Sequence, residues 1–159
     1  CDGARIARFM GDLAGKKRYA IDDAMKAALQ QRYFAGCVDE NGVREEIRRT
    51  WAENHYLMDT HTAVASAVLR AYQAQTGDTR QSVIVSTASP YKFGASVLGA
   101  VAGQKACDRL DDFACCRALA ELTGTREPAQ ILALPDLPIR HTAVCEKDKM
   151  AQAVLDAVK

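Results

Sequence analysis

The spacing of apolar residues over the first half of the chain predicts a series of amphipathic helices. Apolar positions recur every three or four residues over 4–13, and again from Asp22 toward Gly36. A third helix is expected after a turn at 39–42, and it carries Val43, Ile47, Thr50 and Trp51 on one side. A fourth helix is predicted from Asp59 to Gly77, where many small residues indicate burial on more than one side.

The second half of the chain mixes helical patterns with two short β-branched or apolar runs. Ser82–Ser86 has the composition of a strand buried in a sheet, and Ala143–Cys145 suggests a second strand. Helices are expected after Pro90, from 111 or 112 to 122, and from 147 or 148 to the end. This order predicts an α/β fold with a small parallel sheet, within one unit of residues 1–159. Residues 1–58 form its helical segment and residues 59–159 its α/β part.

Charge and composition narrow the possible functions. The 159 residues carry 21 Lys and Arg against 20 Asp and Glu, and the only basic cluster is the triplet at 16–18. This balance gives no reason to expect nucleic acid or an anionic membrane as a partner. No apolar stretch approaches the roughly 20 residues that span a bilayer, and no signal peptide is visible, so we expect a cytoplasmic protein. The start at Cys1 reads as a position within a longer gene product.

Six cysteines are present, and their arrangement favours free thiols over disulfides. Cys115 and Cys116 are neighbours in a helical pattern, too close for a bond between them. No Cys-x-x-Cys pair occurs, and His141 with Cys145 lacks further nearby ligands, so no metal site is expected. A thiol-based redox protein resting on Cys115 and Cys116 remains an alternative.

Two polar segments are candidates for chemistry. Asp59 is placed to cap the fourth helix, with His61 and Thr62 in its first turn, where free N–H groups favour anions. The second segment, Ser86–Phe93, follows the predicted strand, at the edge where open α/β sheets bind ligands. An ordinary helix cap and an ordinary polar turn are the alternative interpretations.

These two segments resemble threonine synthase of the bacterial and fungal type. That family typically shows Asp-Pro-His-Thr-Ala-Val followed by Ser-Thr-Ala-(His or Ser)-Pro-x-Lys-Phe. This chain reads Asp59-Thr60-His61-Thr62-Ala63-Val64 and Ser86-Thr87-Ala88-Ser89-Pro90-Tyr91-Lys92-Phe93. The later stretch 137–145 also looks like the family's carboxy-terminal ending. The resemblance therefore implies a carboxy-terminal fragment of a fold type II enzyme that uses pyridoxal phosphate.

The resemblance also implies roles for individual residues. The enzyme would convert O-phospho-L-homoserine and water to L-threonine and phosphate, and Thr87, with Ser86 beside it, would meet the cofactor's ring nitrogen. Asp59, His61, Ser89 and Lys92 would approach the cofactor or the substrate phosphate. Two positions depart from the family pattern, because Thr60 replaces a proline and Ser89 stands where many relatives have histidine.

The family's cofactor-bearing lysine and phosphate-gripping loop belong to its amino-terminal part and are not found in this sequence. Lys92 is not that lysine, so no catalytic residue is assigned here, and the fragment alone is expected neither to bind the cofactor firmly nor to turn over substrate. Its expected partners are the amino-terminal part of the enzyme, the small substrate and, through exposed apolar surface, another copy of itself. The alternatives are a non-enzymatic helical module that binds a partner, or another pyridoxal-phosphate lyase of the same fold type.

Overall fold

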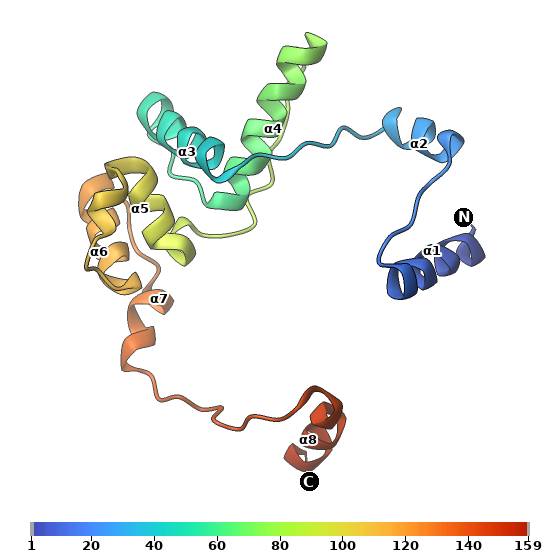
Figure 1. The fold of residues 1–159 in the computed structure, drawn as a ribbon. Coiled ribbons are helices and arrows are strands. Elements are labelled where there is room, and N and C mark those ends of the chain that lie inside the picture. Colours follow the sequence, from blue (N-terminus) through green and yellow to red (C-terminus); the bar gives the residue numbers. More distant parts are fainter. Residues whose placement is uncertain (1, 159) are drawn as a thin grey trace.

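The computed structural model describes residues 2–158, which contain eight α-helices and four 3₁₀ helices (Figure 1). The α-helices are α1 (Gly3–Lys16), α2 (Asp23–Gln30), α3 (Glu40–Asn54), α4 (Thr60–Thr76), α5 (Gly94–Ala102), α6 (Asp112–Thr123), α7 (Ala129–Ala133) and α8 (Met150–Ala157). The 3₁₀ helices are η1 (Pro90–Phe93), η2 (Gln104–Cys107), η3 (Leu134–Asp136) and η4 (Lys147–Lys149). The predicted helices are thus largely confirmed, including the one between Asp59 and Gly77, but the second helix ends at Gln30 and not at Gly36.

Aspartate side chains begin most of the longer helices. An aspartate caps α1, α2, α3, α4 and α6, in each case by accepting a hydrogen bond from a backbone N–H in the first turn. The prediction of a turn at 39–42 is wrong for this reason, because Asp39 accepts from the N–H of Gly42 and thereby starts α3. At the other end of α4, Gly77 adopts a left-handed conformation with φ of 70°, which ends the helix.

The core lies between α3, α4, α5 and α6. Ile47 of α3, Val97 of α5 and Leu119 of α6 are fully buried and belong to one apolar cluster. Helices α3 and α5 are also joined by a hydrogen bond from Arg48 Nε to the carbonyl oxygen of Ala100, at 3.2 Å. Burial of these faces provides most of the stabilisation of this part of the chain.

A buried carboxylate links α3 to α4. Glu46 is almost completely buried, and it forms ion pairs with Arg49 and with Arg70. The Ser66 hydroxyl donates to Glu46 Oε1 at 2.6 Å. A charge removed from water is tolerated when it is paired and hydrogen-bonded in this way, so the network fixes how α3 and α4 pack together.

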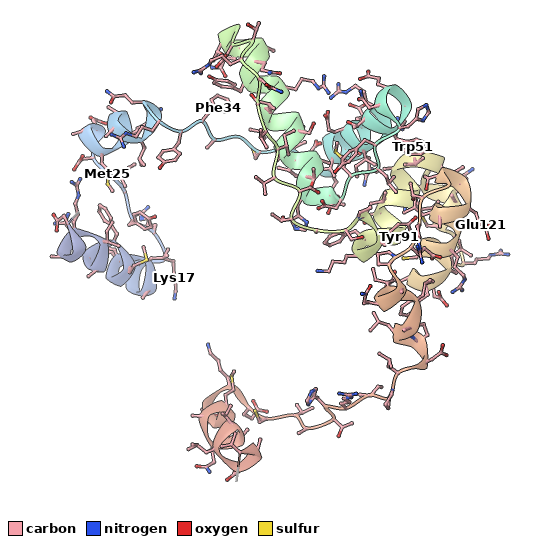
Figure 2. The ribbon with its side chains drawn as sticks, turned by 180° about the vertical axis from the view of Figure 1, so that it is seen from behind. Lys17, Met25, Phe34, Trp51, Tyr91 and Glu121 are labelled. Atoms are coloured by element: carbon pink, nitrogen blue, oxygen red, sulfur yellow. The ribbon has the colours of Figure 1, made fainter. Side chains whose placement is uncertain are left out.

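The two ends of the chain extend away from this core (Figures 1 and 2). Helix α1 contacts the segment 17–22 that leads into α2. The Phe9 and Tyr19 rings stack with centroids 5.1 Å apart, and Arg5 forms an ion pair with Asp22, the residue that caps α2. Helix α8 lies at the far end of an extended stretch that follows η3 (Figure 1). Many apolar side chains in these outer parts are exposed as a result.

The predicted small parallel sheet, and with it the α/β class, is wrong. No residue between 2 and 158 is in a β-strand. Ser82–Ser86 lies outside any helix as expected, but Val83 and Val85 are 88% and 73% exposed. Ala143–Cys145 is likewise without a partner strand, with Val144 95% exposed. A β-branched run favours an extended backbone, but a strand needs a neighbour to accept its hydrogen bonds, and the described residues supply none.

Helices dominate the described residues instead. None of its helices, within 2–158, has the length and apolarity needed to cross a membrane.

Candidate functional site

The site is built around Asp59, the residue that caps α4. Its side chain has no solvent exposure, and Oδ1 accepts hydrogen bonds from the N–H of His61 at 2.9 Å and of Thr62 at 3.3 Å. Burial alone would raise the pKa of this carboxyl. The hydrogen bonds from the Thr62 hydroxyl and from the two backbone N–H groups outweigh burial and hold the pKa below its ordinary value. Asp59 is therefore an anion at neutral pH.

This capping carboxylate occupies the place where an external anion would bind. The N–H groups of His61 and Thr62 are already paired with it, and the N–H of Ala63 donates to the Asp59 carbonyl at 2.9 Å. Since a second negative charge beside Asp59 would be repelled, a ligand phosphate near α4 has to be held by side chains.

The two segments singled out in the sequence meet through Thr62 and Ser86. Thr62 is buried, its hydroxyl donates to Asp59 Oδ2, and its Oγ1 lies 3.0 Å from Ser86 Oγ. A chain of three polar groups thus runs from the helix cap to the end of the β-branched stretch. The stretch returns alongside α4 (Figure 1). Ile84 and Ser86 of this stretch line a groove of about 330 Å³ together with Ser66 and Arg70 of α4.

His61 and Phe93 make the second contact between the segments. Their ring centroids are 5.0 Å apart with the planes tilted by 54°. His61 Nδ1 also lies 3.4 Å from Asp59 Oδ1, while 67% of its side chain remains exposed. Phe93 is partly buried against the apolar core. Its contact therefore holds the His61 imidazole in place while that ring stays exposed to solvent.

Tyr91 fixes the far end of the second segment. It is buried, and its hydroxyl lies 2.6 Å from Thr125 Oγ1 and 3.2 Å from the Thr125 carbonyl oxygen. The Cys116 thiol donates to the Tyr91 carbonyl at 3.2 Å. Figure 2 places Tyr91 within the helical core, well away from Lys17 and Met25 of the amino-terminal helices. The stretch between Ser86 and Phe93 is thus held at both ends.

The remaining predicted residues lie between or beside these anchors. Thr87 is exposed and, among the residues that the structure describes, no group is hydrogen-bonded to its hydroxyl. Lys92 is also exposed, and over 2–158 it has no ion pair. Ser89 is half-buried and caps η1 by accepting from the N–H of Tyr91 at 3.3 Å. The structure thus brings Asp59, His61 and Ser86 together and leaves Thr87 and Lys92 free to meet a ligand.

Thr62, Tyr91 and Phe93 are positioning residues that lay within the two predicted segments but received no role from the sequence. Each was visible in the motif, but none carries an obvious catalytic group. The spacing Asp59-x-x-Thr62 was the available signal for Thr62, because it puts the threonine hydroxyl over the capping carboxylate in the first turn.

The cysteines give no support for a redox centre or a metal site within the described residues. Cys37, Cys107, Cys115, Cys116 and Cys145 are free, and Cys1 lies outside the described residues. Burial, and then the neighbouring Cys107, raise the pKa of Cys115, and burial raises that of Cys116. Across 2–158, no group of three or more His, Cys, Asp or Glu could hold a metal ion.

Comparison with known families identifies the chain. A family model described as "Threonine synthase, C-terminal" matches residues 62–155, well over half of the sequence. The chain belongs to this family. The match begins at Thr62 and contains the whole segment from Ser86 to Phe93, while Asp59 and His61 immediately precede it.

Two curated relatives carry a related name. The chain is 29% identical to "Threonine synthase-like 1" of Homo sapiens over 100 residues, and 29% identical to the protein of that name in Macaca fascicularis over 101 residues. In both cases the alignment covers 63% of this chain and 13% of the relative. This member of the threonine synthase C-terminal family therefore spans only a small part of the length of the relatives it matches.

Proposed function

We propose that this chain is the carboxy-terminal part of a pyridoxal-phosphate-dependent threonine synthase. The complete enzyme would convert O-phospho-L-homoserine and water to L-threonine and phosphate. Family membership supports the proposal, and one structural observation carries it. The contact between Thr62 and Ser86 joins the two segments that resemble the family's site, so the residues proposed to face the cofactor lie in one place.

The residues present suit the cofactor's ring nitrogen. Thr87 offers an exposed hydroxyl that the rest of 2–158 does not use, and a neutral hydroxyl can either donate to a ring nitrogen or accept from it. Ser86 beside it is tied to Thr62. When bound, pyridoxal phosphate supplies the electron sink for carbanion chemistry, and the chain's own residues bind and orient it.

Lys92 and His61 are the side chains proposed to meet a phosphate group, on the substrate or on the cofactor. Both are exposed, and the α4 N–H groups are already occupied by Asp59. Lys92 contributes a full positive charge, and a protonated His61 would contribute another. Asp59, although close by, would act by holding His61 and Thr62 in place, because a carboxylate repels a phosphate.

The isolated chain should be inactive. The lysine that bears the cofactor in this family, and the loop that grips its phosphate, are expected in the amino-terminal part of the enzyme. We expect a solution of the chain and pyridoxal phosphate to show only the spectrum of the free cofactor. Likewise, no phosphate should be released from O-phospho-L-homoserine. A cofactor absorption band that disappears when one particular lysine is replaced would overturn this part of the proposal.

In the complete enzyme, the proposal is tested by replacing Thr87. Thr87→Val removes the hydroxyl while keeping the shape, and we expect threonine formation to fall by about tenfold or more, the equivalent of one lost hydrogen bond. Thr87→Ser should restore most of the activity. Ser96→Ala is the matched control, because Ser96 is another exposed hydroxyl, on α5. Equal activity of the Thr87→Val and Ser96→Ala enzymes would contradict the assignment.

The exposed apolar residues support a role for the rest of the enzyme as the partner of this chain. Helix α1 exposes Ile6, Met10 and Leu13, and the α8 region exposes Val154 and Leu155. Such surfaces are usually covered by another part of a protein or by a second copy.

A further inference from the structure

A polar groove lies between α3, α4 and the extended stretch that follows α4. On α4, Thr62, Ser66 and Arg70 follow one another at intervals of four residues, so they share one face of the helix, and all three line the groove. Thr50 and Asn54, also four residues apart, line it from the end of α3. The volume of about 330 Å³ is at the lower end of the range for small-molecule sites, roughly 300–1,000 Å³. The groove is therefore large enough for a small ligand, and both helices contribute polar side chains to it.

Arg70 gives this groove a positive charge that no neighbouring carboxylate cancels. Arg70 and Arg49 share the single carboxylate of Glu46, so the three side chains together carry one net positive charge. The Glu46 oxygens already accept from both arginines and from the Ser66 hydroxyl. Among residues 2–158, no aspartate or glutamate lines the groove itself. An anion is therefore the kind of ligand that the groove favours.

The guanidinium of Arg70 is held in place but keeps hydrogen-bond donors for a ligand. Its Nη2 donates to Glu46 Oε1 at 3.1 Å. A guanidinium has several N–H donors, and within the described part of the chain no second acceptor is bonded to those of Arg70. The side chain is 51% exposed, whereas that of Glu46 is 1% exposed. The ion pair thus orients the guanidinium from the buried side, and its remaining N–H groups stay available.

Three neutral side chains in the groove are also unpaired. The hydroxyl groups of Thr50 and Tyr56 and the side-chain amide of Asn54 have no hydrogen-bond partner among the residues that the structure describes. Each of these groups can donate to an oxyanion. A phosphate group presents three strong acceptor oxygens and can use more of these donors than a carboxylate, which has two. The donor set therefore favours a phosphate over a carboxylate.

We propose that this groove is a phosphate-binding site, in which Arg70 supplies the charge and Thr50, Asn54 and Tyr56 supply neutral donors. Glu46 is a positioning residue behind Arg70 and does not meet the ligand, because it is buried. One half-exposed arginine with a few neutral hydrogen bonds gives modest affinity. For inorganic phosphate and the isolated chain, we expect a dissociation constant on the order of 1 mM.

The identity of the natural ligand is the one point that rests on the proposed function. The proposed reaction brings two phosphate groups to this chain, one on the substrate and one on the cofactor. Lys92 and His61 can hold one of them, and Ser86 lines the groove in which Arg70 would hold the other. Both ligands are phosphate monoesters, so the groove offers the same chemistry to either of them.

The test is a titration of the isolated chain with inorganic phosphate, followed by nuclear magnetic resonance at constant ionic strength. We expect the amide signals of Thr50, Ser66 and Arg70 to move with a saturable profile. An equal ionic strength of sodium chloride should leave them in place. Unmoved groove signals, or movement confined to the surroundings of Lys92, would overturn the proposal.

Replacing Arg70 tests the role of its charge. Arg70→Gln should weaken phosphate binding by about tenfold or more, because charge-assisted hydrogen bonds are lost. Arg70→Lys should recover part of the affinity, since it keeps the charge but not the planar fork. Arg117→Gln is the matched control, because Arg117 is an exposed arginine of α6 with no ion pair in the described range. Equal affinities of Arg70→Gln and Arg117→Gln would contradict the site.

A second variant covers the case in which Arg70→Gln does not fold. Thr50→Val combined with Asn54→Ala removes two neutral donors and leaves the ion pairs of Glu46 intact. This double variant should bind inorganic phosphate about three- to tenfold more weakly than the parent chain. Unchanged affinity in the folded double variant would overturn the proposal without any reference to Arg70.

Competition distinguishes the two phosphate monoesters. O-phospho-L-homoserine and pyridoxine 5′-phosphate are each added to the chain in the presence of inorganic phosphate. Pyridoxine phosphate is used because it lacks the aldehyde that reacts with surface lysines. The groove serves the monoester that displaces inorganic phosphate at the lower concentration. If neither displaces it, the assignment to a phosphate monoester is wrong.

Failure of this site and failure of the proposed function give different results. A folded chain that binds no phosphate in the groove would end the present proposal even if Thr87→Val inactivates the complete enzyme. A fully active Thr87→Val enzyme would end the proposed function and leave the measured phosphate binding unaffected.

Discussion

Thr62 Oγ1 lies 3.0 Å from Ser86 Oγ, although the two residues are 24 positions apart in the sequence. The contact joins the first turn of α4 to the end of the β-branched stretch that follows it. Thr62 is also hydrogen-bonded to the buried Asp59. The position of the exposed residues Ser86 and Thr87 is therefore fixed relative to the start of α4. The site is thus positioned by a helix cap.

Removing the Asp59 carboxylate should destabilise the chain more than removing an exposed cap. Asp59→Ala loses the cap and leaves the buried Thr62 hydroxyl without its acceptor, at a cost of about 3 kcal/mol. Asp39→Ala is the control, because Asp39 caps α3 from an exposed position and should cost about 1 kcal/mol. Urea unfolding of both variants measures the difference. If both variants lost the same free energy of unfolding, burial of Asp59 would add nothing to its capping role.

The same carboxylate should make stability depend on pH in acid. Its folded-state pKa is lowered, so its contribution is present above the unfolded pKa of about 3.9 and is lost as the pH falls toward the folded value. Asp59→Asn removes that contribution, so the variant should lose less stability than the parent chain as the pH falls below about 4. Asp78, whose pKa is also lowered by Arg80, remains in both proteins and cancels in the comparison. Parallel pH profiles of the two proteins would contradict the prediction.

Gly94 should not tolerate a side chain at the contact between α5 and α6. A Cβ at this position would lie 2.6 Å from Cys116 Sγ and 3.3 Å from the Cys116 backbone nitrogen. We expect Gly94→Ala to cost about 1–3 kcal/mol through overpacking, measured by thermal or urea unfolding. Gly11→Ala in α1 is the control, because nothing lies within 4 Å of its Cβ position. That variant should instead favour the helix. A Gly94→Ala chain as stable as the parent would show that α6 can move aside.

The thiols should react in two classes. Cys37 and Cys145 are exposed, whereas Cys115 and Cys116 are buried and burial raises their pKa, which lowers the reactive thiolate fraction at neutral pH. Brief alkylation followed by peptide mass mapping should therefore label the first pair quickly and the second pair slowly. Denaturation in urea should abolish the difference. Rapid labelling of Cys116 in the native chain would contradict its hydrogen bond to Tyr91.

The isolated chain should self-associate through its exposed apolar residues. Val83 and Val85 project from an unpaired stretch, and unpaired extended segments with apolar side chains invite association. Size measurements across a dilution series should show dimers or larger species that dissociate on dilution. Replacing both valines with serine should reduce this association while leaving the urea midpoint nearly unchanged, because neither side chain is in the core. A strict monomer at every concentration would contradict the prediction.

The helices show where local sequence information was sufficient. Asp59 and Gly77 predicted both ends of α4, since a capping carboxylate and a left-handed glycine act through neighbouring backbone groups. Local information was misleading at 82–86. The run of β-branched residues favours an extended backbone. Whether it becomes a strand depends on a neighbouring strand that accepts its hydrogen bonds, and the local sequence does not show whether one is present.

The helical segments, the cap at Asp59 and the resemblance of two short motifs to threonine synthase could be read from the amino-acid sequence alone. Those features depend on residues within a few positions of one another. The tertiary structure was needed to show that Thr62 contacts Ser86, that the His61 and Phe93 rings lie 5.0 Å apart, and that the Thr87 hydroxyl has no partner among the described residues. Such contacts depend on how the stretch after α4 folds back along that helix, and this in turn follows from burial of side chains far apart in the sequence.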